Sequence, residues 1–197
     1  MINHAAGLLF SPTREWQKIE VRGDRGGNIF YFLVLALLPA AAWYYGTTQI
    51  GWSVGDGEVT RLTAASALRL IVLFYLAMVI SIVLIGYSIH WMAISYGATS
   101  SLLRGISVAG FTATPLLLGG LIGFSPVLWA ALLIGIVTVS WSLYLLYLGI
   151  PIVMHVPEDR GFLFASAVVA VCLVILIGIM GASVILWDMG FAPEYTN

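Results

Sequence analysis

The residues from Gly105 to Pro157 read GISVAGFTATPLLLGGLIGFSPVLWAALLIGIVTVSWSLYLLYLGIPIVMHVP and contain no Asp, Glu, Lys or Arg. A soluble domain of 197 residues could not bury so long an uncharged apolar stretch in its core. A bilayer can, because one helical crossing of its hydrocarbon layer takes about 20 apolar residues. The stretch is too long for a single crossing, and the sequence GFSP at 123–126 provides a turn near its middle. We therefore predict two membrane spans joined by a tight hairpin.

The composition of the whole chain agrees with this assignment. Hydrophobic residues make up 61% of the chain, charged residues 9%, and the mean hydropathy is +1.03, whereas soluble domains carry about 25% charged residues. The net charge of -1 provides no field that would attract nucleic acid, so we expect none as a partner. A single cysteine, Cys172, excludes a disulfide or a Cys-based metal site within one chain. We predict an integral membrane protein whose main partner is the lipid bilayer, with no cofactor.

Five apolar segments can be separated by charges, Gly and Pro. Each must be helical, because an open strand in lipid would leave backbone N–H and C=O groups unpaired. Pro39 and Pro115 lie inside the first and third segments and should kink or break those helices locally. The predicted fold is all-α: an integral membrane bundle of five transmembrane helices, preceded by an N-terminal amphipathic cytoplasmic helix within residues 1–28 and followed by a short tail, 188–197. The membrane domain covers 29–187, with spans at about 29–50, 70–94, 108–124, 127–150 and 162–187.

Basic residues predict the orientation of these spans. Six lie on one side of the predicted topology and two on the other, and loops rich in Lys and Arg stay in the cytoplasm. The N-terminus is therefore expected in the cytoplasm and the C-terminus outside. The first group is Arg14, Lys18, Arg22, Arg25, Arg104 and Arg160, and the second is Arg61 and Arg69.

The N-terminal segment has the pattern of a helix. Ser11 before Pro12 is typical of an N-cap followed by proline at the first helical position. Trp16 and Ile19 then follow at helical spacing, with basic residues on other faces. Such a helix can lie on the membrane surface with Trp16 at headgroup depth. It can also pack under the bundle as a cap, and the two arrangements are compatible.

Ionisable residues inside spans are expensive and therefore mark candidate sites. His90 lies near the cytoplasmic end of the second predicted span beside Tyr87, and a cavity bordered by both and by the Pro115 kink would be a polar or pore-lining site. The alternative is an interfacial histidine that is hydrogen-bonded to a neighbouring helix. Arg69 and Asp188 could pair at the other ends of their helices, or each could reach the interface separately.

A second group of polar residues lies in the last cytoplasmic loop: His155, Glu158, Asp159 and Arg160. A histidine with two carboxylates could bind a divalent metal or sense pH. The carboxylates also suit the first turn of the following helix, where they favour its dipole. Because the spacing is not that of a metal-ligand motif, we predict no metal site.

Small residues spaced four apart let membrane helices approach closely. Gly119 and Gly123 form such a pair in the third span, and Gly178 and Ala182 form one in the fifth. They are candidates for packing within the bundle or for a dimer interface.

Three stretches carry a resemblance to a known family: FSPTREWQKI at 10–19, YGATSSLLRGISVAGFTATP at 96–115 and YLLYLGIPIVMHVPEDR at 144–160. Together they resemble the Yip family of polytopic membrane proteins, in particular its bacterial branch. The resemblance implies an N-terminal cytoplasmic segment followed by five spans, and a bacterial inner membrane. Eukaryotic members look like trafficking factors that engage Rab-type GTPases. This chain lacks their long N-terminal domain and their Asp-Leu-Tyr-Gly-Pro stretch.

Three functions are compatible with these features. No hydrolase, metalloprotease or phosphate-loop motif is present, which makes a membrane-embedded enzyme the weakest of them, so we predict a non-enzyme. The favoured function is a scaffold, membrane organiser or partner-binding subunit, acting as a homo-oligomer or with another membrane protein. The alternative is a small-solute or ion transporter or channel with a site near spans two and three, where broken helices could border it.

Overall fold

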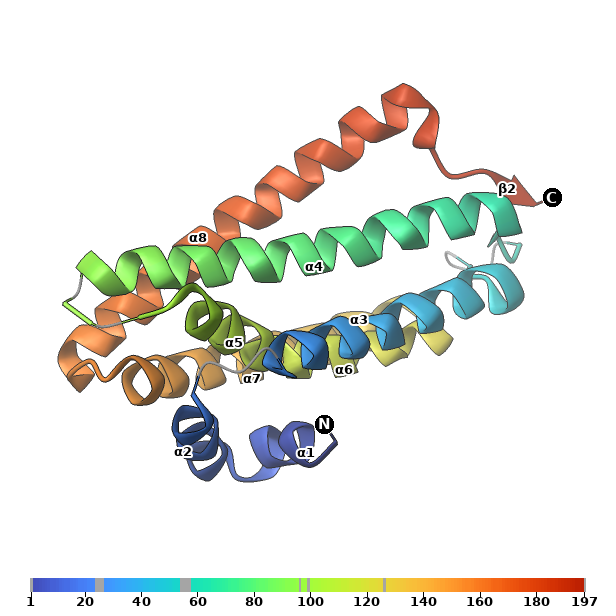
Figure 1. Cartoon of the computed structure of the whole chain (residues 1–197). Coiled ribbons are helices and arrows are strands. Elements are labelled where there is room, and N and C mark those ends of the chain that lie inside the picture. Colours follow the sequence, from blue (N-terminus) through green and yellow to red (C-terminus); the bar gives the residue numbers. More distant parts are fainter. Residues whose placement is uncertain are drawn as a thin grey trace.

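The computed structural model describes residues 2–23, 27–53, 58–95, 97–98, 100–125 and 127–196. Two short helices, α1 (Ile2–Phe10) and α2 (Pro12–Arg22), precede long helices that run roughly along one another (Figure 1). The remaining elements are α3 (Gly27–Tyr45), η1 (Gly46–Ile50), β1 (Arg61–Leu62), α4 (Ala64–Ser95), α5 (Leu102–Thr112), α6 (Thr114–Gly119), η2 (Gly120–Phe124), α7 (Leu128–Met154), α8 (Glu158–Leu186), η3 (Trp187–Phe191) and β2 (Tyr195–Thr196). The prediction of an all-α membrane bundle is confirmed.

Four helices among the described residues are long and apolar enough to cross a bilayer. They cover Asn28–Ile50, Ala64–Ser95, Leu128–Met154 and Asp159–Phe191. The helix of the second predicted span begins at Ala64, six residues before the predicted start at 70, because Arg69 does not end it. The Thr63 hydroxyl instead accepts a hydrogen bond from the Ser66 backbone N–H at 3.3 Å and caps its first turn.

The third predicted span is a bent pair of helices. Leu102–Thr112 and Thr114–Phe124 meet at 40°, so the chain makes a fifth crossing if the pair counts as one span. The break falls at Ala113, two residues before Pro115, which cannot donate a backbone hydrogen bond into the preceding turn. Pro39 does not break its helix, because α3 continues through it. Of the predicted turn GFSP, Gly123 and Phe124 are the last two residues of η2, and Ser125 follows them. Pro126 lies outside the described residues.

The bent pair follows the length of the bundle. A Cβ atom at Gly110 would lie 2.7 Å from Phe32 near the start of α3, and one at Gly123 would lie 2.7 Å from Trp43 near its end. Glycine is required where helices come this close. The core lies along this contact and continues under α1 and α2. Its fully buried side chains include Trp16, Phe32, Ile89, Leu145 and Phe164.

Helix α8 leaves the bundle toward its C-terminal end, and the chain then returns to the start of α4 (Figure 1). Residues 192–196, which we call the C-terminal tail, end in β2, which pairs antiparallel with β1. The Glu194 N–H donates to the Ser66 hydroxyl at 3.0 Å, and Arg69 Nη2 donates to the Glu194 carboxylate at 2.8 Å. Arg69, for which pairing with Asp188 was one of two possibilities, instead pairs with Glu194, which the tail brings to it.

Candidate functional site

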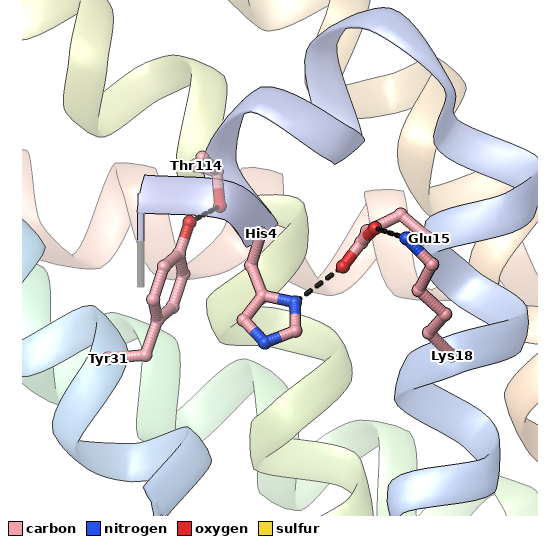
Figure 2. Close-up of polar contacts among 5 residues, drawn as sticks. All are labelled: His4, Glu15, Lys18, Tyr31 and Thr114. Atoms are coloured by element: carbon pink, nitrogen blue, oxygen red, sulfur yellow. Dashed lines mark hydrogen bonds and ion pairs between the residues drawn. The ribbon is translucent and has the colours of Figure 1, made fainter.

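A buried carboxylate stands at the centre of the strongest polar cluster in the described chain. Glu15 of α2 is 3% exposed, although the sequence around it is that of a surface helix. His4 Nδ1 of α1 contacts one of its oxygens, and the Lys18 ammonium donates to the other at 3.1 Å (Figure 2). A Cβ atom at Gly7 would lie 2.4 Å from the same carboxylate, so α1 can approach only because this residue is glycine. We call α1 and α2 the N-terminal cap.

Two opposing effects set the charge of Glu15. Burial raises the pKa of its carboxyl, because desolvation penalises the charged form. Hydrogen bonding and electrostatic attraction to His4 and Lys18 outweigh it, so the pKa of Glu15 lies below the ordinary value of 4.5. Glu15 is therefore ionised at neutral pH, and its negative charge holds the two cap helices together.

A second polar pair lies where the bent helix pair breaks. Tyr31 of α3 and Thr114, the first residue of α6, share a buried hydrogen bond of 2.9 Å between their hydroxyls. The ring of Phe111 lies between this pair and the cap, with centroids 4.8 Å from Tyr31 and 5.8 Å from His4. Figure 2 shows Tyr31 and Thr114 on one side of the His4 imidazole and Glu15 and Lys18 on the other. The cap is thus seated on the break in the third predicted span.

Further contacts fix the cap to α7. Trp16 is completely buried, and a Cβ atom at Gly149 would lie 2.6 Å from its ring. Trp141 Nε1 donates to the Leu8 carbonyl of α1 at 3.3 Å. The burial of Trp16 shows that the cap packs against the bundle, which was one of the two compatible arrangements. Ser11 occupies the predicted position before α2 but makes no side-chain capping hydrogen bond.

The cap carries a hollow with a volume of about 600 Å³, which is lined by His4, Arg14, Gln17, Lys18 and Val21. Arg14 and Lys18 line it with positive charge, and Val21 adds an apolar wall. Val21 is 81% exposed, and Phe10 at the end of α1 is 84% exposed. Exposed aromatic and basic side chains together are typical of binding surfaces.

The model of the Yip1 domain matches residues 6–179. This chain belongs to the Yip1 family. It is 36% identical to the inner membrane protein YohC of Escherichia coli K12 over 192 residues, which cover 96% of this chain and 98% of YohC. The YohC of Escherichia coli O6:H1 strain CFT073 matches with the same identity and coverage. No solved structure gives a significant match. The resemblance drawn from the sequence is therefore confirmed.

Within this Yip1-family bundle, the three residues proposed as a polar site are not gathered around a cavity. Tyr87 is 56% exposed on α4, whereas Pro115 is buried in α6. His90 lies one turn from Tyr87 and packs beside Gly105, and its Nδ1 has no hydrogen-bond partner among the described residues. Four cavities were found among the described residues, and Tyr87, His90 and Pro115 line none of these four.

The four small residues divide into two groups. Gly119 and Gly123 pack within the bundle, since a Cβ atom at Gly119 would lie 2.5 Å from Thr138 of α7 and one at Gly123 would lie 2.7 Å from Trp43. A Cβ atom at Gly178 would meet nothing within 4 Å, and Ala182 is exposed. This second pair lines a groove between α4 and α8.

In the predicted loop site, His155 contacts a residue of the N-terminal cap. His155 ends α7 with a left-handed backbone, and its Nε2 lies 2.9 Å from the Glu20 carboxylate of α2. Asp159 and Arg160 are exposed at the start of α8, and the side chain of Glu158 lies outside the described residues. The described residues contain no group of three His, Cys, Asp or Glu side chains arranged to hold a metal.

The cluster around Glu15 was not predicted from the sequence, because α1 was not predicted. One signal was available. Glu15 lies four residues before Ile19 and next to Trp16, so it shares the apolar face of α2. A carboxylate on the face that packs inward requires a cation beside it, and His4 could have been considered as its partner.

Proposed function

We propose that this Yip1-family protein is a non-enzymatic membrane scaffold that binds a partner protein through the outer face of its N-terminal cap. One observation carries the proposal: the cap has two faces with opposite properties. Its inner face is fixed to the bundle through the buried side chains of Glu15 and Trp16. Its outer face displays Arg14, Lys18 and Val21 around an open hollow.

Rigid presentation of such a face favours binding. A surface that is already ordered does not lose conformational entropy when a partner docks. The basic side chains suit a partner with acidic groups, and the exposed side chains of Phe10 and Val21 suit apolar contacts beside them. A second membrane protein is the expected partner, and a further copy of this chain is the alternative.

The polar cluster supports a structural role more than a catalytic one. Glu15 already binds His4 and Lys18, so its oxygens are engaged with the fold. A general base needs access to a substrate proton, at about 2.6–3.2 Å or through one water. A carboxylate that is enclosed and paired in this way anchors the cap.

We also propose that the cap lies in the cytoplasm and that the chain crosses the membrane five times. The excess of basic residues at the N-terminal end supports the first statement. The path of the bent pair from Phe32 to Trp43 along α3 supports the second. A reporter active only in the cytoplasm, fused after Asn197, should then be inactive, while the same reporter at the N-terminus should be active. Activity at both ends would contradict five crossings.

The binding face can be tested in living cells with a photo-crosslinking amino acid. Gln17 lines the hollow and is exposed, whereas Ile19 on the same helix is buried. We expect a discrete crosslinked product from position 17 and none from position 19, and the mass of the product identifies a partner or a second copy. Arg14→Glu should abolish the product by reversing a charge at the rim of the hollow.

Two outcomes would overturn the scaffold proposal. One is the absence of any protein adduct at position 17. The other is an adduct that forms equally well in Arg14→Glu and at the buried position 19. The transport alternative predicts instead that purified protein in liposomes moves an ion or small solute, and that substitution of His90 or Pro115 stops this flux.

A further inference from the structure

Helices α4 and α8 enclose a large apolar groove between them. It has a volume of about 610 Å³. Figure 1 shows the two helices diverging toward the end that carries the C-terminal tail. Each helix contributes one stripe of side chains. Leu73, Ile80 and Leu84 come from α4, and Gly178, Ala182 and Leu186 come from α8. We call this hollow the α4–α8 groove.

Its walls favour an apolar occupant. The two serines among the lining residues both use their hydroxyls within their own helices. Ser81 donates to the Ala77 carbonyl at 2.6 Å, and Ser183 donates to the Ile179 carbonyl at 2.9 Å. A ligand with polar groups inside the groove would therefore lose hydrogen bonds to water without gaining replacements, which costs free energy.

The size of the groove decides between a helix and a hydrocarbon chain. A helix of 20 residues is about 30 Å long and 10 Å across, so it displaces roughly 2,400 Å³. The space in the groove is smaller than that. A second copy of the chain could cover the groove but could not place a helix inside it. A single acyl chain, which is narrow and flexible, can enter beside Gly178, where a Cβ atom would meet nothing within 4 Å.

The wide end of the groove carries an ion pair. Arg69 lies one helical turn before Leu73 and so continues the α4 stripe. Its guanidinium binds Glu194 through Nη2 alone, and the two side chains are 43% and 58% exposed. The tail holds Glu194 in place, because the Thr63 N–H donates to the Glu194 carbonyl at 3.0 Å. A positive and a negative group are thus fixed side by side where the groove opens.

This arrangement is complementary to a zwitterionic headgroup. Arginine recognises phosphate through its fork of N–H donors, and a carboxylate accepts hydrogen bonds from a primary ammonium. We propose that the α4–α8 groove binds one acyl chain of an ethanolamine phospholipid, with the phosphate on Arg69 and the primary ammonium on Glu194. A choline headgroup has no N–H to donate, and a glycerol headgroup has no ammonium, so both fit less well.

The test uses the full-length protein in nanodiscs made of phosphatidylethanolamine and phosphatidylglycerol. A trace of phosphatidylethanolamine carries a photoactivatable group on one acyl chain, and mass spectrometry maps the residues that it labels. We expect labelling to concentrate on the α4 and α8 stripes, above the level on the exposed α7 face around Leu132 and Ile136. Labelling at equal density on all exposed faces would overturn the proposal.

Substitutions on α8 supply a matched pair. Gly178→Phe fills the groove, whereas Gly181→Phe places the same side chain on the same helix outside it, and neither added Cβ meets a neighbour within 4 Å. Gly178→Phe should lower labelling of the stripes about tenfold, equivalent to about 1.4 kcal/mol of binding free energy. Gly181→Phe should leave it unchanged. Ala182→Phe serves as a second filling variant if the first does not fold. Equal labelling in filled and control variants would overturn the proposal.

The headgroup is tested by exchanging it on the labelled lipid. The wild type should label more strongly with the ethanolamine lipid than with the choline lipid, and Glu194→Gln should remove this preference. Arg69→Gln should weaken labelling by both lipids. If the preference persists in Glu194→Gln, the assigned ligand is wrong.

Discussion

The two sides of this bundle use the same residue type for opposite purposes. Where α3, α7, the bent pair and the N-terminal cap meet, glycines allow contact: a Cβ atom at Gly120 would lie 2.4 Å from Pro39, and one at Gly149 would lie 2.6 Å from Trp16. Along the outer half of α8, a Cβ atom at Gly178 or Gly181 would meet nothing within 4 Å. Composition alone does not distinguish the glycines that allow helix contact from those on the open half of α8. The difference depends on whether another element approaches, and only one side of the molecule is closed by the N-terminal cap.

Charged groups show the same contrast. On the closed side, Glu15 is enclosed by His4 and Lys18 and is almost completely buried. On the open side, Arg69 and Glu194 form a pair that remains largely exposed. Solvent weakens an exposed pair, whereas a buried charge that loses its partner is costly. Substitutions on the closed side should therefore have much larger effects.

The largest effect is expected from Trp16→Ala, which removes the side chain that seats the cap on α7. Truncating a fully buried Trp costs about 3–5 kcal/mol of unfolding free energy. Chemical unfolding in detergent micelles, followed by circular dichroism, measures it. Trp129→Ala is the control, since Trp129 is 75% exposed and its removal should change stability by less than about 0.5 kcal/mol. Equal effects of both substitutions would show that the cap is not part of the stable core.

Glu15→Gln should come next, at about 1–3 kcal/mol, because it removes a buried charge that His4 and Lys18 bind. The pKa of Glu15 is lowered in the folded state, so its contribution is complete above the ordinary value of 4.5 and disappears as pH falls through the lower folded value. The stability difference between wild type and Glu15→Gln should therefore be constant near neutral pH and shrink below pH 4.5. A difference that grows on acidification would contradict this assignment.

The hydrogen bond at the helix break should contribute less. Tyr31→Phe removes one hydroxyl of the buried pair with Thr114, and we expect a loss of about 0.5–1.5 kcal/mol. A double-mutant cycle with Thr114→Val isolates the interaction, because the second substitution should cost little once the first is present. Additive effects would mean that the two hydroxyls do not depend on each other.

Arg69→Gln on the open side should have the smallest effect. An exposed ion pair contributes about 0–1 kcal/mol, and the tail keeps its backbone contacts with Thr63 and Ser66. The same unfolding measurement should place this variant near the wild type. A loss as large as that of Glu15→Gln would mean that the tail, and not only the cap, stabilises the bundle.

Much of the fold could be predicted from the sequence, because local composition determines it. The uncharged run from Gly105 to Pro157 required membrane helices, and Pro115 predicted the break before α6. Family membership was predictable as well, since the resemblance covered most of the chain.

The unpredicted features depend on contacts between residues far apart in the chain. Arg69 binds Glu194, which is 125 positions away, and not Asp188, because β2 pairs with β1 and carries the tail across. The burial of Glu15 depends on the approach of α1 at Gly7. The α4–α8 groove exists because α8 diverges from α4. Since α8 is apolar along most of its length, its sequence does not indicate where a neighbouring helix contacts it.

One pair of variants tests the contrast between the closed and open sides most directly. Gly149→Leu and Gly178→Leu make the same substitution inside apolar helices, so the change in helix propensity cancels between them. We expect Gly149→Leu to collide with Trp16 and to lose about 1–3 kcal/mol, seen as a melting temperature lower by about 2–4 °C per kcal/mol. Gly178→Leu should melt like the wild type or above it. Equal melting temperatures for the two variants, or a lower one for Gly178→Leu, would contradict the division of this bundle into a closed side and an open side.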